Sequence, residues 1–253
     1  MTDDRRSRVR VDDHDGVAVL TLDDGRVNAL SVELLADLEA SLGQVAAADA
    51  VVLTAAGHVF CAGADLRRLT AEEPKHTAEF LEAVERTFRL LLELPRPVVA
   101  AVNGHAIAGG CVLACCSDRR LMSSGTIGLA EVSVGLPFPA VAVEALAWAA
   151  PAAMVDLSLT GRLMAADEAA RVGLIDIVVP QDDLQSAAVH EAATLGALPQ
   201  AGYAHIKRQL QSAALHGARQ ARDAQAAVVE AWTSEPGRAA MRVQLERLDG
   251  ARR

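Results

Sequence analysis

Aromatic residues, lysines and cysteines are all scarce in this sequence of 253 residues. Aromatic side chains make up 3% of it, and only two of its 24 basic residues, Lys75 and Lys207, are lysines. With a formal net charge of -9, the chain is not expected to bind nucleic acid or anionic membranes in general, although a local basic pocket for a phosphorylated ligand stays open. Its hydrophobic fraction of 51% and charged fraction of 23% exclude a disordered chain and suffice for a large buried core.

The four cysteines indicate a reducing compartment. Cys61, Cys111, Cys115 and Cys116 form no C-x-x-C pair, and their small apolar neighbours predict buried thiols that act as hydrophobic groups. A metal site made of His105, Cys111 and Cys115 is not expected, because the uncharged surroundings lack outer-shell partners, and His105 is predicted to be a packed loop residue. No apolar stretch near the first residues resembles a secretory signal.

One long uncharged run needs a separate explanation. Residues 97–117 contain no Asp, Glu, Lys or Arg, and the run is long enough to span a membrane. Asn103-Gly104-His105 and Gly109-Gly110 would interrupt a helix twice, so we expect a buried strand over Val98–Val102, a glycine-bearing loop and a short buried helix. The chain is therefore predicted to be cytoplasmic, with no membrane as its partner.

Strands and helices alternate in the first half of the chain. Strands are predicted over 16–22, 50–54 and 98–102, and helices over about 31–46, with Ser31 as the N-cap, and about 77–94. Because no hairpin signal separates the strands, this order predicts parallel pairing and an α/β fold. From about residue 181 the pattern is helical, with helices expected over 186–195, 203–215, 218–232 and 236–248 and a break at Gly217. This tail has too few strongly apolar residues for its own core, so we expect it to pack on the first half or on another subunit.

Two glycine-containing loops, each between a strand and a helix, are candidates for chemistry. Phe60–Leu66 (FCAGADL) and Ala108–Cys111 (AGGC) match neither the phosphate loop of nucleotide-binding proteins nor the G-x-G-x-x-G fingerprint. Side by side, two helix N-termini can direct two backbone N–H groups at one carbonyl oxygen and form an oxyanion hole. The spacing alone favours the simpler interpretation, in which the glycines only let helices approach strands closely.

An ordered set of motifs carries a family resemblance. Val27–Ser31 (VNALS), Phe60–Leu66, Asn103–Cys111 (NGHAIAGGC) and Ile127–Gly135 (IGLAEVSVG), followed by Leu159–Pro180, resemble the signatures of the crotonase superfamily, the enoyl-CoA hydratase/isomerase family. The resemblance covers nearly the whole chain. It implies a spiral of β-β-α turns, with a core over residues 1–195 that holds the acyl-CoA and active sites. Residues 196–253 would form a helical oligomerisation region that packs into homotrimers, often paired as hexamers.

The resemblance also implies site residues. The backbone N–H groups of Ala64 and Gly109 match the positions that hold the thioester oxygen of an acyl-CoA. The positions implied to line the coenzyme A and acyl pockets are Ala29, Ala62, Asp65, Leu66, Gly110, Val112 and Leu136. Arg26 is the candidate for the coenzyme A phosphates, whereas Lys207 is interpreted as a solvated surface charge. Coenzyme A would arrive as part of the substrate, with no separate cofactor.

The number of carboxylates separates two activities of the family. Hydratases use two glutamates to hold a water molecule; here the first position is Val112 and the second is Glu131. This single-glutamate pattern resembles the Δ3,Δ2-enoyl-CoA isomerases, and the apolar neighbours of Glu131 are expected to raise its pKa toward that of a working base. Glu144 is predicted to face solvent. An enoyl-CoA hydratase and a non-catalytic acyl-CoA-binding protein remain as alternatives.

Overall fold

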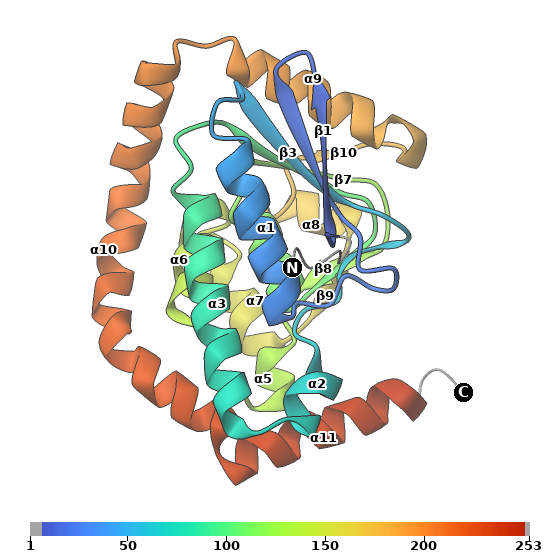
Figure 1. Ribbon diagram of the computed structural model, residues 1–253, viewed down its shortest axis with the longest axis vertical. Coiled ribbons are helices and arrows are strands. Elements are labelled where there is room, and N and C mark those ends of the chain that lie inside the picture. The colour runs from blue at the N-terminus through green and yellow to red at the C-terminus, as the bar shows by residue number, and fades with distance from the viewer. Residues whose placement is uncertain (1–6, 251–253) are drawn as a thin grey trace, which may run out of the picture.

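Two β-sheets form the centre of the computed structural model, which describes residues 7–250, without the side chains of residues 213–223 (Figure 1). The six-stranded sheet has the order β1 (Val9–His14), β2 (Val17–Leu22), β3 (Ala50–Ala55), β5 (Val98–Val102), β7 (Arg119–Met122) and β10 (Ile177–Val178). The four-stranded sheet has the order β4 (Val59–Cys61), β6 (His105–Ile107), β8 (Thr126–Gly128) and β9 (Leu163–Ala165). Successive strands β3 to β8 alternate between the two sheets, so the chain advances by repeated β-β-α turns and the predicted α/β class is confirmed.

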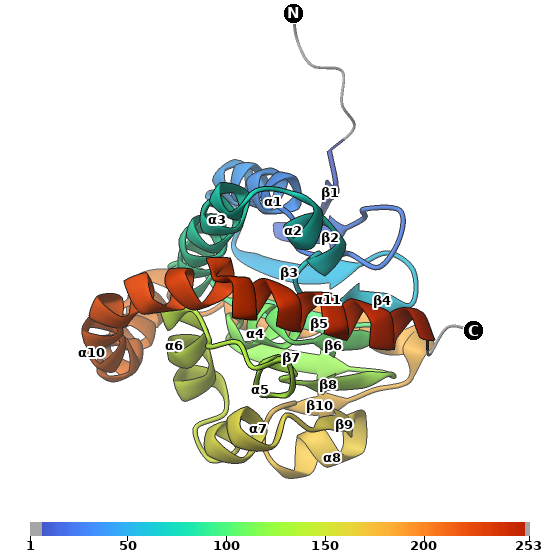
Figure 2. The same cartoon turned by 90° about the horizontal axis from the view of Figure 1, so that it is seen from below.

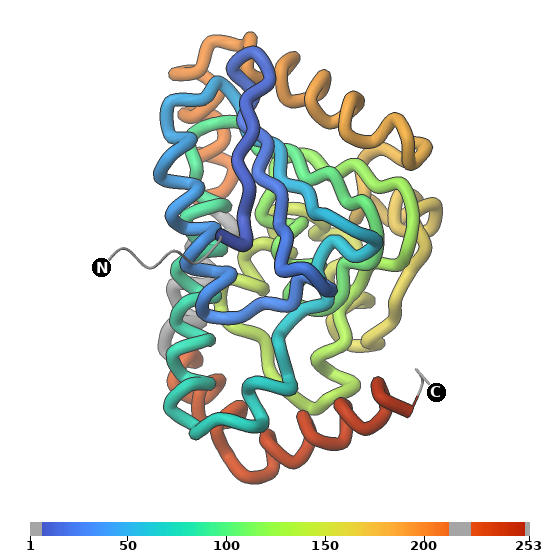
Figure 3. Tube along the Cα trace, turned by 45° about the vertical axis from the view of Figure 1, so that its right-hand side comes forward, coloured from blue at the N-terminus to red at the C-terminus, as the bar shows by residue number. Residues whose placement is uncertain are grey.

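Strand pairing is parallel in both sheets, as predicted, except at one edge strand of each. β1 pairs antiparallel with β2, and β9 pairs antiparallel with β8. β1 and β2 form a hairpin, which Figure 3 shows in blue. The prediction that the strands lack hairpins was wrong: Asp15-Gly16 has positive φ values of 53° and 88° and forms the tight turn that this dipeptide favours. β1 is charged and half exposed, which hides its strand character in the sequence.

Helices connect the strands and make up most of the second half of the chain. The first set is α1 (Val32–Gln44), α2 (Leu66–Ala71), α3 (Pro74–Leu92), α4 (Gly109–Cys115), α5 (Glu131–Val134), α6 (Ala140–Ala149), α7 (Met154–Thr160) and α8 (Ala166–Arg171). Ser31 caps α1 as predicted, because its side chain accepts a hydrogen bond from the N–H of Leu34. α9 (Leu184–Gly196) covers one face of the six-stranded sheet, and the main core lies on the other face.

The C-terminal tail packs on the first half of the same chain. α10 forms one helix over Gln200–Thr233, so the predicted break at Gly217 was wrong. α10 packs on α3 and α6, and α11 (Glu235–Gly250) packs on α2. Figure 2 shows α11 lying across this end of the molecule. Within residues 7–250, no helix is long and apolar enough to cross a membrane.

Lys207 is not the solvated surface charge that was predicted. Its side chain is 5% exposed, and its ammonium group donates to Asp118 Oδ2 at 2.9 Å and to the carbonyl of Arg96 at 3.3 Å. Asp118 Oδ2 also accepts from the N–H of Val98 and the hydroxyl of Tyr203. The partner charge comes from Asp118, which is 89 residues away in the sequence. The sequence pattern therefore could not reveal that Lys207 ties α10 to the sheet.

Loss of this buried lysine is expected to destabilise the fold strongly. Lys207→Ala leaves the buried Asp118 carboxylate without its cation, which typically lowers the free energy of unfolding by about 3–5 kcal/mol. Urea denaturation of the variant measures this change. The matched control is Lys75→Ala, because Lys75 is 84% exposed beside Glu79 and should change stability by less than about 0.5 kcal/mol. Equal midpoints for the two variants would contradict the structural role given to Lys207.

Candidate active site

Residues from widely separated parts of the chain line one cavity of about 390 Å³. The loop before α1 contributes one wall, α2 and α3 a second, and the start of α4 a third. α5, α6, α10 and α11 complete it. Ala64, Gly109 and Glu131, the three residues predicted to carry the chemistry, all line this cavity.

A short parallel bridge positions the N–H group of Ala64. Leu30 pairs with Ala64 through two hydrogen bonds, from the N–H of Leu30 to the carbonyl of Gly63 (2.8 Å) and from the N–H of Asp65 to the carbonyl of Leu30 (3.0 Å). In such a bridge, the N–H of the intervening residue points away from the partner strand. Among the described residues, the N–H of Ala64 has no acceptor, so it is available to a ligand.

The second N–H group belongs to Gly109, at the first position of α4. Ala108, just before it, has φ 54° and ψ -121°, a strained conformation for a residue with a side chain, and such strain is concentrated at functional sites. Within the described chain the N–H of Gly109 also has no acceptor, as is usual in the first turn of a helix. A side chain on Gly63 would meet Ala108 Cβ at 3.0 Å and Gly109 N at 3.4 Å, so the loops carrying the two N–H groups are in contact.

Glu131 brings a carboxyl group to the same cavity from the first turn of α5. The residue is half-buried, and its Oε2 is completely buried with no hydrogen-bond partner in the described part of the chain. Burial raises the pKa of Glu131 to about 7, against smaller opposing contributions from the backbone N–H groups of Glu131 and Ala130. A carboxylate with this pKa can both take and return a proton near neutral pH.

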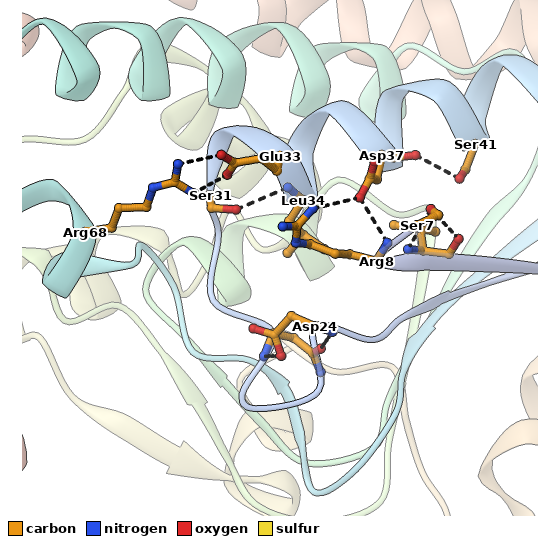
Figure 4. A network of polar contacts seen from close by, with 11 residues as sticks. Ser7, Arg8, Asp24, Ser31, Glu33, Leu34, Asp37, Ser41 and Arg68 are labelled. Carbon is orange, nitrogen blue, oxygen red and sulfur yellow. Dashed lines mark hydrogen bonds and ion pairs between the residues drawn. The ribbon is translucent and has the colours of Figure 1, made fainter. Parts of the chain in front are cut away.

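Polar contacts hold the loop before α1 and the start of α2 in place (Figure 4). The Asp24 carboxylate accepts hydrogen bonds from the N–H groups of Arg26, Asn28 and Ala29 and so shapes the loop. Arg68, on α2, forms a two-pronged ion pair with Glu33 at the start of α1. Burial opposes ionisation of Glu33, but the hydrogen bonds from Arg68, the Glu33 backbone N–H and Ser31, together with the charge of Arg68, outweigh it and lower the pKa to about 2. This pair joins the elements on both sides of the Leu30–Ala64 bridge.

The structure places most of the other predicted site residues on the cavity wall. These are Arg26, Ala29, Ala62, Asp65, Leu66, Val112 and Leu136. Asp65 also caps α2, since its Oδ1 accepts from the N–H of Arg68 at 3.2 Å. Gly110 packs elsewhere: a Cβ on it would lie 2.2 Å from the carbonyl oxygen of Cys61, so it allows α4 to approach β4.

Two other polar residues, Glu144 and His105, differ from their predictions. Glu144 does not face solvent; its side chain is 1% exposed and pairs with Arg89 at 2.8 Å. It is thus neutralised by Arg89 and does not line the described cavity. His105 is exposed on β6 rather than packed in a loop, and its Nδ1 lies 3.0 Å from Thr126 Oγ1. Among the described side chains, which leave out residues 213–223, no group of three or more His, Cys, Asp and Glu could hold a metal ion.

Sequence reasoning missed the contribution of the two C-terminal helices to the cavity. Trp232 comes from α10, and Gln244, Leu245 and Leu248 come from α11. No local signal marks them, because their role depends on how α10 and α11 fold back over α3 and α2. Arg67 is a second exposed cation beside Arg26 on the wall, and it forms an ion pair with Asp249 of α11.

Comparison with known proteins gives a consistent result. A family model described as enoyl-CoA hydratase/isomerase matches residues 12–249. Enoyl-CoA delta isomerase 1 of Mus musculus is 33% identical over 195 residues, which cover 73% of this chain and 66% of that protein. A putative enoyl-CoA hydratase of Thermus thermophilus is 39% identical over 176 residues, covering 65% of this chain and 68% of that protein. The chain thus spans about two thirds of the length of these curated relatives.

A solved structure extends the similarity over almost the whole chain. The human mitochondrial Δ3-Δ2-enoyl-CoA isomerase superimposes with a TM-score of 0.88 at 31% sequence identity. The superposition covers 96% of this chain and 99% of the human one. Because the relatives include both isomerases and hydratases, the choice between the two reactions depends on the residues of the site.

Proposed function

Since this chain belongs to the enoyl-CoA hydratase/isomerase family and has its crotonase fold, we propose that it converts a 3-enoyl-CoA into the conjugated 2-enoyl-CoA. The observation that carries this proposal is the Glu131 carboxyl, whose buried Oε2 has no hydrogen-bond partner among the described residues. Asp24 and Asp65 also lie on the wall, but their carboxylates hold the loop before α1 and cap α2. At the position of the first glutamate of hydratases stands Val112, which is 2% exposed and can neither hold nor activate water.

The proposed reaction moves one proton between two carbons of the substrate. The N–H groups of Ala64 and Gly109 hydrogen-bond to the thioester oxygen and make the C2 proton more acidic. The Glu131 carboxylate takes this proton, and the electron pair spreads over the carbonyl and the double bond as a dienolate. Negative charge on the oxygen is stabilised by the two N–H groups. Glu131, now protonated, returns the proton to C4, so that the double bond becomes conjugated with the carbonyl.

Acyl-CoA binding is assigned to the residues around the mouth of the cavity. Arg26 and Arg67 are exposed cations on its wall and suit the coenzyme A phosphates, while Ala29, Ala62 and Leu66 offer small or apolar surface to the pantetheine arm. Coenzyme A enters as part of the substrate, and no separate cofactor takes part. We place the activity in cytoplasmic fatty acid metabolism.

The region 196–253 is proposed to assemble the chain into trimers or hexamers. On α10, Ile206 is 57% exposed and Leu210, one turn further, is 61% exposed. Adjacent apolar side chains on one helix face favour contact with another subunit over contact with water. Light scattering coupled to size-exclusion chromatography measures the mass directly.

Two substrates distinguish the proposed isomerase from its alternatives. An isomerase converts 3-enoyl-CoA to 2-enoyl-CoA, which gains absorbance from conjugation. A hydratase converts 2-enoyl-CoA to 3-hydroxyacyl-CoA, and a binding protein turns over neither. Conversion of 2-enoyl-CoA alone would overturn the isomerase proposal in favour of a hydratase.

The pH dependence of isomerisation follows from the raised pKa of Glu131. The base acts only when deprotonated, so kcat/KM should rise with pH through about 7, the pKa of Glu131, and level off above it. Initial rates at subsaturating 3-enoyl-CoA between about pH 5 and pH 9 measure this. A profile that is flat from about pH 5 upward would show that the base ionises in the ordinary range of a glutamate and would contradict the raised pKa assigned to Glu131.

A second carboxylate at position 112 should create hydration. Val112→Glu places the missing group on the cavity wall, where it can hold water against C3 of a 2-enoyl-CoA. We expect the rate of 3-hydroxyacyl-CoA formation to rise at least about tenfold, since acid–base assistance typically contributes 10²–10⁴-fold and the buried site is imperfectly adapted. Val112→Gln is the matched control, because it has nearly the same size and no acidic group. An equal rise in both variants would contradict the role assigned to the carboxylate.

A further inference from the structure

The residues that line the cavity differ in how far they are exposed to solvent. Arg26 and Arg67 are exposed, and Leu248 is 47% exposed, so these residues mark the mouth. Phe80 is 2% exposed and Trp232 5%, although both line the same cavity. These two aromatic rings therefore belong to the part of the wall that lies away from the mouth.

Trp232 is held firmly in this buried part of the wall. Its indole Nε1–H donates a hydrogen bond to the carbonyl of Pro137 at 2.9 Å. Its ring also contacts Phe80 of α3, with the ring centroids 6.5 Å apart and the planes tilted by 41°. A buried indole with its N–H satisfied and its ring packed is a rigid group. Pro137 follows α5, so the same contact joins the end of α10 to the segment that begins with Glu131.

We propose that Trp232 ends the acyl pocket and makes the protein select enoyl-CoA thioesters of medium chain length. This inference rests on the proposed function, because it names the substrate class of the same site. The 390 Å³ of the cavity holds roughly a dozen groups of about 30 Å³ each, the size of a methylene or a water molecule. The thioester and the pantetheine arm also occupy this cavity, so fewer than about a dozen acyl carbons fit in it.

The apolar wall of the cavity predicts that short acyl chains bind weakly. Leu81 and Val84 of α3 and Ala142 of α6 line the cavity together with the aromatic rings. Each methylene that moves from water to this surface should raise affinity about fourfold. The gain stops where the chain reaches Trp232, because a longer chain has to break the bond to Pro137 and separate the indole from Phe80.

The chain-length profile of the whole protein tests the first half of the proposal. Straight-chain 3-enoyl-CoAs of six, eight, ten, twelve and sixteen carbons are compared by kcat/KM, and saturated acyl-CoAs of the same lengths by calorimetric affinity. We expect both quantities to rise about fourfold per methylene up to eight to ten carbons and to fall at least about tenfold by sixteen. A continued rise to sixteen carbons, or equal values at all lengths, would overturn the proposal.

Variants of the two tryptophans test the role of Trp232 itself. Trp232→Ala and the milder Trp232→Leu remove the indole from the cavity end and should raise the ratio of sixteen-carbon to eight-carbon affinity at least about tenfold. Trp148→Ala is the matched control, because Trp148 packs against the core from α6 without lining the cavity, and its ratio should stay within about twofold of the parent's. An unchanged ratio in a folded Trp232→Leu protein would overturn the assignment.

The affinity measurement separates failure of this inference from failure of the proposed function. Isomerisation at every chain length without an optimum leaves the isomerase intact and removes the role of Trp232. Medium-chain binding without isomerisation supports the pocket and removes the proposed reaction. Absence of acyl-CoA binding at all lengths overturns both.

Discussion

Replacement of Glu131 by glutamine is expected to lower kcat for isomerisation by about 10²–10⁴-fold, the usual contribution of a positioned acid–base group. The amide has nearly the same shape as the acid and stays in the first turn of α5, but it cannot take the C2 proton. The affinity for a saturated acyl-CoA should change little, because the N–H groups and the apolar walls are untouched. Single-turnover rates with 3-enoyl-CoA and calorimetry with the saturated thioester measure the two effects separately.

The same variant has an expected effect on stability with a definite sign. The pKa of Glu131 in the folded protein, about 7, is above its ordinary value of 4.5. Its favourable contribution is therefore complete below about pH 4.5 and is lost as the pH rises through 7, where ionisation strands a charge in the cavity. Glu131→Gln should equal the parent near pH 4.5 and exceed it by about 1–2 kcal/mol above pH 8, after allowance for partial exposure.

Glu82→Gln is the matched control for this substitution. Glu82 is exposed on α3 and does not line the described cavity. The control should therefore keep both the rate and the pH dependence of stability. If Glu131→Gln isomerises 3-enoyl-CoA as fast as the control does, another group carries the proton.

Removal of the Gly109 N–H is the second change with a large expected effect. Gly109→Pro deletes this donor at the first position of α4, where proline is well tolerated by a helix. Loss of one donor of an oxyanion hole typically lowers kcat by about 10²–10³-fold. The measurement is kcat with a 3-enoyl-CoA, with circular dichroism to follow folding.

Gly109→Ala separates loss of the donor from crowding. A Cβ at this position would lie 2.7 Å from Leu30 Cδ1, the far end of a flexible side chain that can shift. The alanine variant carries the same Cβ and keeps the N–H, so it should retain most of the activity. An alanine variant as slow as the proline variant would attribute the effect to crowding and leave the oxyanion role of Gly109 unsupported.

Much of the fold was predictable because the local rules of the sequence agree with the final packing. The interior strands β3 and β5 are continuous apolar runs, and Ser31 is a regular N-cap. Prediction failed where the sequence signal was weak or where the deciding residues lie far apart in the sequence. The hairpin of β1 and β2 depends on Asp15-Gly16 beside a charged edge strand, and burial of Lys207 depends on Asp118, far away in sequence.

The site residues likewise divide into those that the sequence reveals and those that it does not. Ala64, Gly109 and Glu131 lie in short motifs that the sequence displays directly, and the structure places all three on one cavity. Trp232 and Leu248 could not be found, because they reach the cavity only after α10 and α11 fold back over the core. The chemistry is thus encoded locally, whereas the shape of the pocket is a property of the tertiary structure.

A crystal structure with a bound saturated medium-chain acyl-CoA tests the proposed reaction most directly. The thioester oxygen should lie about 2.7–3.1 Å from the backbone nitrogens of both Ala64 and Gly109. One oxygen of Glu131 should stand close to both C2 and C4 of the chain. An oxygen bound elsewhere, or a Glu131 carboxyl turned away from C2, would contradict isomerisation by a single carboxylate.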